Sequence, residues 1–110
     1  MEAALKAIVE PRRRQILRLV REGEMTAGEI ASHFEVTRPA VSQHLSVLKD
    51  AGLLAERREG TKRIYRFRPE GVRELRDFIE EMWTERLDVL KREAEREERG
   101  RGGAGPSRRR

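Results

Sequence analysis

The sequence predicts a mainly α-helical fold with one small β-hairpin, in the order four short helices, two strands and one long helix. Three observations support this prediction. Apolar residues recur at the three- and four-residue spacing of amphipathic helices in most of the chain. Two threonines stand where they would cap successive short helices. An alternating pattern then flanks a glycine-containing turn at residues 59–62, as expected for a hairpin.

The first two helices meet at a proline. A short apolar segment containing Leu5 and Ile8 predicts a first helix, which breaks near Pro11 because proline lacks the N–H that a helix interior needs. Pro11 then opens a second helix that runs through Val20, with Gly23 as its stop. The residues of this second helix that we expect to face inward are Ile16, Leu17 and Val20.

The third helix begins with a capping box. Thr26 and Glu29 have the spacing in which each side chain bonds to the other residue's backbone N–H. We expect this helix to span Ala27 to about Phe34, with Glu35–Thr37 as a three-residue connection to the next helix. Two capped helices joined so closely predict a helix-turn-helix, and any small helical hairpin is the less specific alternative.

The fourth helix has a defined start and end. Thr37 caps it, Pro39 lies in its first turn, and Gly52 ends it at a position suited to a left-handed residue. Its apolar face is formed by Val41, Leu45 and Leu48. Its outer face carries small polar and cationic side chains of the kind that read a DNA major groove, namely Arg38, Pro39, Ser42, Gln43, Ser46 and Lys49.

The predicted hairpin consists of strands at Leu53–Arg58 and Arg63–Arg68. It contains six cations against the two acids Glu56 and Glu59, and this excess suits the phosphates beside a DNA groove. Charge that protects an edge strand from aggregation would explain the same pattern. The six cations are Arg57, Arg58, Lys62, Arg63, Arg66 and Arg68.

The last predicted helix runs from Gly71 to about Glu98 and carries an apolar stripe that a domain of this size is unlikely to cover alone. We therefore expect a second copy to cover it, with the first helix contributing. Trp83 would also suit a ligand pocket. The Gly- and Arg-rich residues 99–110 are expected to form a disordered tail. The stripe consists of Val72, Leu75, Phe78, Ile79, Met82, Trp83, Leu87 and Leu90.

The charges are segregated along the chain. Residues 1–69 hold 14 Lys/Arg and 9 Asp/Glu, whereas residues 70–98 hold 6 and 11, and residues 99–110 hold five arginines and no acid. An acidic helix that follows a basic segment favours a polyanion as the partner of the first part of the chain.

Two runs resemble a known family. The pattern Ala40-Val41-Ser42-x-His44-Leu45-x-x-Leu48-x-x-Ala51-Gly52-Leu53, preceded by Glu10-Pro11-x-Arg13-Arg14-x-Ile16-Leu17, resembles the ArsR-type winged-helix repressors, and Gly60 followed by a basic strand with Tyr65 fits their wing. The resemblance covers residues 3 to about 90. It implies a homodimeric bacterial or archaeal transcription factor, usually a repressor released by a signal. It also implies that His44 reaches a phosphate, and the segment from Trp83 to Leu90 resembles the branch without metal-sensing motifs.

The residues needed for other chemistries are missing. The chain has no cysteine, and its two histidines, His33 and His44, are too few and too scattered for a zinc site. The last helix offers only carboxylates such as Asp77, Glu81 and Asp88, which alone are poor zinc ligands. We expect no metal, no cofactor and no enzyme activity. Because no stretch approaches the ~20 apolar residues of a membrane span, we expect a cytoplasmic protein that does not enter the membrane.

The sequence thus predicts a winged helix-turn-helix protein whose residues 1–98 bind duplex DNA and dimerise, most simply as a repressor on a palindromic operator. An unknown small-molecule inducer is a further possible partner. A winged helix used for protein interaction or RNA association is the alternative function. We expect base contacts from Arg38, Pro39, Ser42 and Gln43, and DNA backbone contacts from Thr37, His44, Ser46, Lys49, Arg57, Arg58, Lys62 and Arg63. The expected dimer interface consists of Leu5, Ile8, Leu75, Ile79, Met82, Trp83, Leu87 and Leu90.

Overall fold

The computed structural model describes residues 1–100 and divides the chain into two compact units, residues 1–76 and residues from 77 onward. The last helix begins in the first unit and continues into the second. In residues 1–100 no helix is long and apolar enough to span a membrane. The elements are α1 (Glu2–Val9), α2 (Pro11–Arg21), β1 (Met25–Thr26), α3 (Ala27–Ala31), α4 (Arg38–Asp50), β2 (Leu54–Glu59), β3 (Lys62–Phe67) and α5 (Pro69–Gly100).

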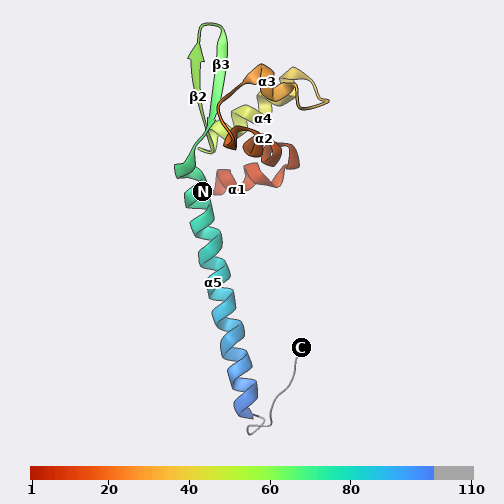
Figure 1. Ribbon diagram of the computed structural model, residues 1–110. Coiled ribbons are helices and arrows are strands. Elements are labelled where there is room, and N and C mark those ends of the chain that lie inside the picture. Colours follow the sequence, from red (N-terminus) through yellow and green to blue (C-terminus); the bar gives the residue numbers. More distant parts are fainter. Residues whose placement is uncertain (101–110) are drawn as a thin grey trace. The chain divides into compact units, whose positions relative to one another are not determined.

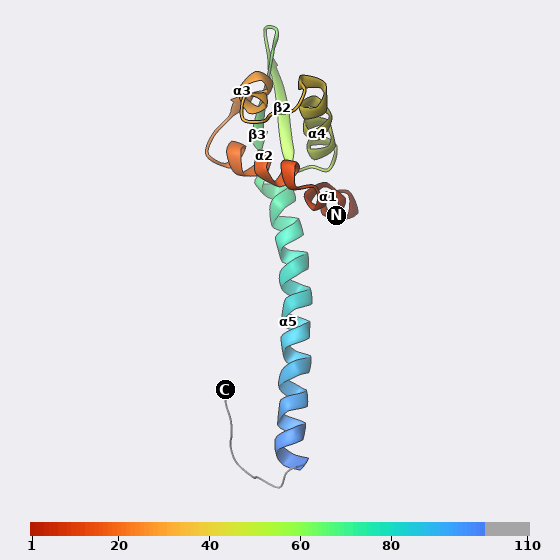
Figure 2. The ribbon, with the colours of Figure 1, turned by 90° about the vertical axis from the view of Figure 1, so that its right-hand side faces the viewer.

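The sheet has three antiparallel strands, and β3 lies in the middle between β1 and β2. The hairpin β2–β3 was predicted, whereas the two-residue strand β1 was not. Met25 pairs with Tyr65 and Thr26 pairs with Ile64, so Thr26 both ends β1 and caps α3. Helices α2, α3 and α4 lie on one side of the hairpin, and the tip of the hairpin extends past them (Figures 1 and 2).

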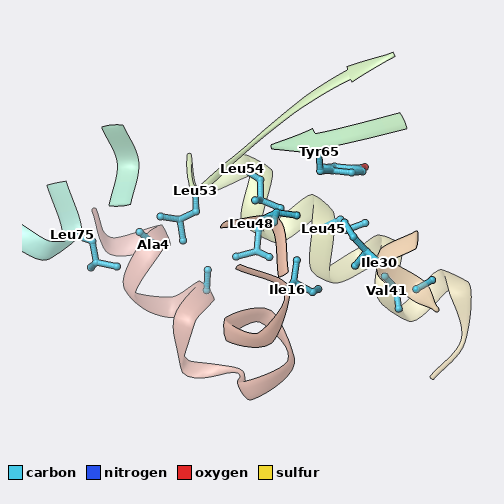
Figure 3. Packing of buried hydrophobic residues seen from close by; sticks show 13 residues of the cluster. Ala4, Ile16, Ile30, Val41, Leu45, Leu48, Leu53, Leu54, Tyr65 and Leu75 are labelled. Carbon is cyan, nitrogen blue, oxygen red and sulfur yellow. The ribbon is translucent and has the colours of Figure 1, made fainter. Parts of the chain in front are cut away.

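One apolar cluster holds the first unit together (Figure 3). The predicted inward residues of α2 and α4 are buried in it, while Leu17 is partly buried against it. Tyr65 of β3 closes the cluster on the sheet side. The fully buried large side chains, all less than 2% exposed or at that limit, are Ile16, Val20, Ile30, Val41, Leu45, Leu48, Leu53 and Leu54.

The predicted starts of α3 and α4 are confirmed. The Thr26 hydroxyl accepts from the Glu29 N–H at 3.1 Å, and the Glu29 carboxylate accepts from the Thr26 N–H at 2.8 Å. The Thr37 hydroxyl accepts from the Ala40 N–H at 3.2 Å. Gly52 has a φ of +80°, the left-handed conformation expected after α4.

Several predicted boundaries are wrong by a few residues. Helix α3 ends at Ala31 and not near Phe34, so six residues and not three connect it to α4. The backbone N–H groups of His33 and Phe34 donate to the carbonyls three residues earlier, those of Ile30 and Ala31, and tighten the chain there. Phe34 packs against the core. Strands β2 and β3 each lie one residue closer to the turn than predicted. Helix α5 runs from Pro69 to Gly100 and not from Gly71 to about Glu98. Residues 99 and 100, assigned to the tail, are therefore helical, and residues 101–110 lie outside the described part.

Leu75 was predicted for the dimer interface, but the structure places it in the core of its own chain. Its side chain is only 7% exposed, and it lies beside Ala4 of α1 (Figure 3). Helix α5 is held there by a close approach of its first turn to the end of α4. A Cβ added at Gly71 would overlap the carbonyl oxygen of Gly52, so only glycine fits at this contact without a shift.

The second unit leaves large apolar side chains of α5 exposed. The most exposed is Trp83 at 64%, and Val89, which sequence analysis did not include in the stripe, lies on the same helix face. The exposed large apolar residues of this unit are Ile79, Met82, Trp83, Leu87 and Leu90.

Candidate nucleic-acid interface

The outer face of α4 is open to solvent. Its apolar residues Val41, Leu45 and Leu48 turn into the core, which leaves the opposite side of the helix uncovered. All six residues predicted for this outer face are exposed, and so is the capping Thr37. The exposed residues of the outer face are Arg38, Pro39, Ser42, Gln43, Ser46 and Lys49.

A groove brings this face together with the hairpin. It has a volume of about 530 Å³ and lies between the start of α3, the first turns of α4 and the turn that joins β2 to β3. Arg38 and Ser42 of α4 line it together with Lys62 and Arg63 of β3. The other lining residues are Thr26, Ala27, Gly28 and Thr61. Three cations thus line one groove, and no acidic residue lines it.

The two faces of the hairpin differ. Antiparallel partners place their side chains on the same face, so Arg58 lies opposite Arg63 and Glu56 lies opposite Tyr65 on one face. This face is turned toward α4, because Lys49 of α4 reaches Glu56 at 3.5 Å. Two like charges directly opposite each other destabilise a strand pair. Arg63 also hydrogen-bonds to the Tyr65 hydroxyl, and its charge contributes to the lowered pKa of Glu56.

Arg57 belongs to the other face of the hairpin. It pairs in register with Ile64, and its guanidinium donates to Glu24 at 2.6 Å and to Glu59 at 3.2 Å. The hydrogen bond from Arg57 lowers the pKa of the Glu24 carboxyl below its usual value. This placement argues against the phosphate contact predicted for Arg57, because its guanidinium already forms ion pairs with two carboxylates.

A short polar chain fixes the hairpin to α4. The Tyr65 hydroxyl donates to Glu56 at 2.7 Å, and Glu56 forms an ion pair with Lys49. Burial, followed by the hydrogen bond to Glu56, raises the pKa of Tyr65 to about 12, and the same hydrogen bond lowers the pKa of Glu56. Lys49, which was predicted to contact the DNA backbone, therefore already forms an ion pair with a carboxylate of the hairpin.

His44 is half-buried at the edge of the α4 core face. Its Nδ1 lies 3.4 Å from a guanidinium nitrogen of Arg13 in α2. Burial and the neighbouring Arg13 lower the pKa of His44 below its ordinary value. No local sequence signal predicts the contact between Arg13 and His44, because the two residues are 31 positions apart.

Other residues of the surface were also missed. Gly28 and Thr61 line the groove, although sequence analysis treated the first only as part of a capped helix and the second only as a turn residue. The cations that flank the turn at residues 59–62 were the available signal for Thr61. Among residues 1–100, no three histidine, aspartate or glutamate side chains are grouped so that they could hold a metal ion.

Comparisons with known proteins identify the family. The family model described as "Bacterial regulatory protein, arsR family" matches residues 10–56. The HTH-type transcriptional regulator Rv2034 of Mycobacterium tuberculosis is 41% identical over 86 residues, which are 78% of this chain and 80% of that protein. The chain belongs to the ArsR family.

Further relatives agree with this ArsR assignment. The transcriptional repressor SdpR of Bacillus subtilis is 47% identical over 60 residues, which cover 54% of this chain and 67% of that protein. A solved winged helix-turn-helix DNA-binding domain from Mycobacterium bovis, described as homodimeric and as a possible ArsR-family regulator, superimposes with a TM-score of 0.61 at 35% identity. That comparison covers 78% of this chain and 80% of the other. The ArsR protein described above is thus a transcriptional regulator with a winged helix-turn-helix fold.

Proposed function

We propose that this ArsR-family regulator is a dimeric repressor that binds a palindromic duplex-DNA operator through α4 and the hairpin β2–β3. The groove lined by Arg38, Ser42, Lys62 and Arg63 is the observation that supports this most directly. It joins the exposed face of α4 to the basic tip of the hairpin without an acidic residue between them. A convex helix beside a cationic hairpin matches a major groove with its flanking phosphates.

Base reading falls to the first two turns of α4. Gln43 offers an amide that pairs with adenine in two hydrogen bonds, and Arg38 offers a guanidinium suited to guanine. Ser42 and Pro39 complete this surface with a small hydroxyl and an apolar contact. All four side chains are exposed, so none has to leave the core to reach a base.

The phosphate contacts fall to the edges of the same surface. The proposed cations are Arg58, Lys62 and Arg63 on the hairpin and Lys49 on α4, each of them exposed. Thr37 and Ser46 add hydroxyl donors, and His44 adds a ring N–H. We leave Arg57 out of this set because Glu24 and Glu59 already bind its guanidinium.

The apolar face of α5 supports the dimer. Met82 is 55% exposed and Trp83 is 64% exposed, and such side chains gain most by burial against another copy. The homodimeric relative from Mycobacterium bovis supports the same assembly. Within α1, Leu5 and Ile8 pack partly on their own core, and we propose that their remaining surface lies beside the partner. Residues 1–98 would then form one DNA-binding and dimerisation domain that acts by binding alone, in the cytoplasm.

The test is selection of bound duplexes from a random DNA pool, followed by titration of the selected site and of random DNA. We expect a palindrome with half-sites about one helical turn, ~34 Å, apart. Gln43→Ala should weaken binding to the selected site by ~1–3 kcal/mol and binding to random DNA much less. The matched control is Gln15→Ala, which removes the other glutamine of the chain from an exposed position on α2.

The outcomes separate the two candidate functions. Equal losses on both DNAs for Gln43→Ala would contradict base reading by α4. If no duplex is enriched while single-stranded RNA binds, the RNA-associated alternative replaces this proposal.

A further inference from the structure

The side chain of Arg13 has two tasks, and the first is to close the end of α1. A helix leaves its last four carbonyl groups without helical partners. Helix α1 ends at Glu10 in an extended conformation, which supplies no left-handed cap. Arg13 donates to the carbonyls of Ala7 at 2.7 Å and Lys6 at 3.4 Å.

Arg14 closes the other two carbonyl groups. It donates to Ile8 at 2.7 Å and to Val9 at 3.0 Å, so the two neighbouring arginines satisfy all four carbonyls. Only Arg13 also reaches the recognition helix α4. Because two of its nitrogens are bound to α1, its third nitrogen is held in a fixed direction toward His44.

The second task follows from the chemistry of the guanidinium, which is a donor only. Its contact with Nδ1 of His44, at 3.4 Å, is a hydrogen bond only in the tautomer whose Nδ1 accepts. A neutral imidazole that accepts at Nδ1 carries its proton at Nε2. Three charged groups act on the His44 ring. The charges of Arg13 and Arg12 disfavour the imidazolium, and the charge of Glu10 favours it. Half-burial adds to the disfavouring side.

We infer that Arg13 is a positioning residue that holds His44 in its neutral Nε2–H form, so that His44 meets the DNA as a hydrogen-bond donor and not as a cation. The DNA contact in this inference rests on the proposed function. The tautomer of His44 is independent of that function. A neutral donor releases no counterion, so His44 adds affinity without adding salt dependence. Cations such as Lys62 and Arg63 add both affinity and salt dependence.

The first experiment is a pH titration of the full chain by ¹⁵N NMR, which reports the tautomer and the titration midpoint of each ring. The chain has only two histidines, so the ring signals of His44 are readily assigned. We expect His44 to be the Nε2–H tautomer and to titrate below the ordinary pH of an imidazole. Arg13→Met should raise the His44 midpoint and mix its tautomers.

The matched control is Arg14→Met, which removes two carbonyl bonds of α1 but no contact with His44. It should leave the His44 midpoint and tautomer unchanged. A His44 midpoint at or above that of an unperturbed imidazole, or equal effects of the two arginine variants, would overturn the inference. If Arg13→Met does not fold, a wild-type His44 found as the Nδ1–H tautomer would still overturn the inference.

The second experiment is the salt dependence of DNA binding. His44→Ala should weaken binding several-fold at every salt concentration with no change in slope, whereas Lys62→Ala should lower the slope by about 0.9. His44→Gln, which keeps an N–H near the Nε2 position, should recover part of the affinity. A reduced slope for His44→Ala contradicts the neutral donor. If the wild type binds no DNA, the proposed function is contradicted, and the NMR result for the His44 tautomer is unaffected.

Discussion

Two arginines of one hairpin give a direct test of which face meets DNA. Arg63 lies opposite Arg58 on the face turned toward α4 and lines the groove. Arg57 lies on the other face and is bound by Glu24 and Glu59. Sequence analysis assigned both to phosphate contacts, and both are exposed. Their alanine variants remove the same charge from the same hairpin, so a difference between them reports its orientation.

The expected magnitude follows from counterion release. Each neutralised phosphate contributes about 0.9 to the slope of log affinity against log salt, so Arg63→Ala should lower the slope by about 0.9. Over a fourfold rise in salt this single contact accounts for a roughly 3.5-fold loss of affinity. Removal of Arg63 relieves its repulsion with Arg58 but also removes its interactions with Tyr65 and Glu56, so thermal unfolding without DNA must accompany the binding measurement. Arg57→Ala should change the slope by less than about a third of that amount, because its charge is already paired.

The assay is fluorescence anisotropy of a labelled duplex at four salt concentrations between 50 and 200 mM. Thermal unfolding of each variant in the absence of DNA serves as the folding control. The reasoning is refuted if both variants lower the slope equally, or if only Arg57→Ala does. The first result would mean that DNA displaces the carboxylates from Arg57. The second would place DNA on the opposite face of the hairpin.

Four further predictions follow. Met82→Glu should halve the mass measured by light scattering while helical circular dichroism persists, because it puts a charge on an apolar interface; an unchanged mass would remove the exposed face of α5 from the dimer. Gly71→Ala should lower the midpoint of thermal unfolding by several degrees, since its Cβ meets the Gly52 carbonyl; an unchanged midpoint would contradict the close approach. Tyr65→Phe should cost about 1–2 kcal/mol at pH 7, and the difference should narrow below about pH 4 as the Glu56 carboxylate, whose pKa is lowered by Tyr65, becomes protonated; a pH-independent difference would contradict the charge-assisted bond. Micromolar zinc or a chelator should leave operator affinity unchanged, and stoichiometric zinc binding coupled to DNA release would disprove this.

The amino-acid sequence by itself determined the starts of α3 and α4, the core face of α4 and the outer face opposite it. These features depend on residues within about one or two helical turns of each other. Thr26 with Glu29 forms a capping box wherever a helix follows, and Gly52 adopts the left-handed conformation because only glycine does so without cost. The apolar spacing of Val41, Leu45 and Leu48 likewise fixes which side of α4 stays exposed.

Only the tertiary structure decided which distant residues meet. The strand β1 has two residues and no alternation, so it forms only because β3 offers an edge beside Met25. The same pairing brings Glu24 to Arg57, which is the reason we leave that arginine out of the proposed DNA surface. Arg13 and His44 are 31 residues apart, and Leu75 reaches the core only where α5 begins beside Gly52. Charge and periodicity state what each side chain can do, but its partner depends on how the chain brings segments together, because hydrogen bonds and ion pairs act over a few ångströms.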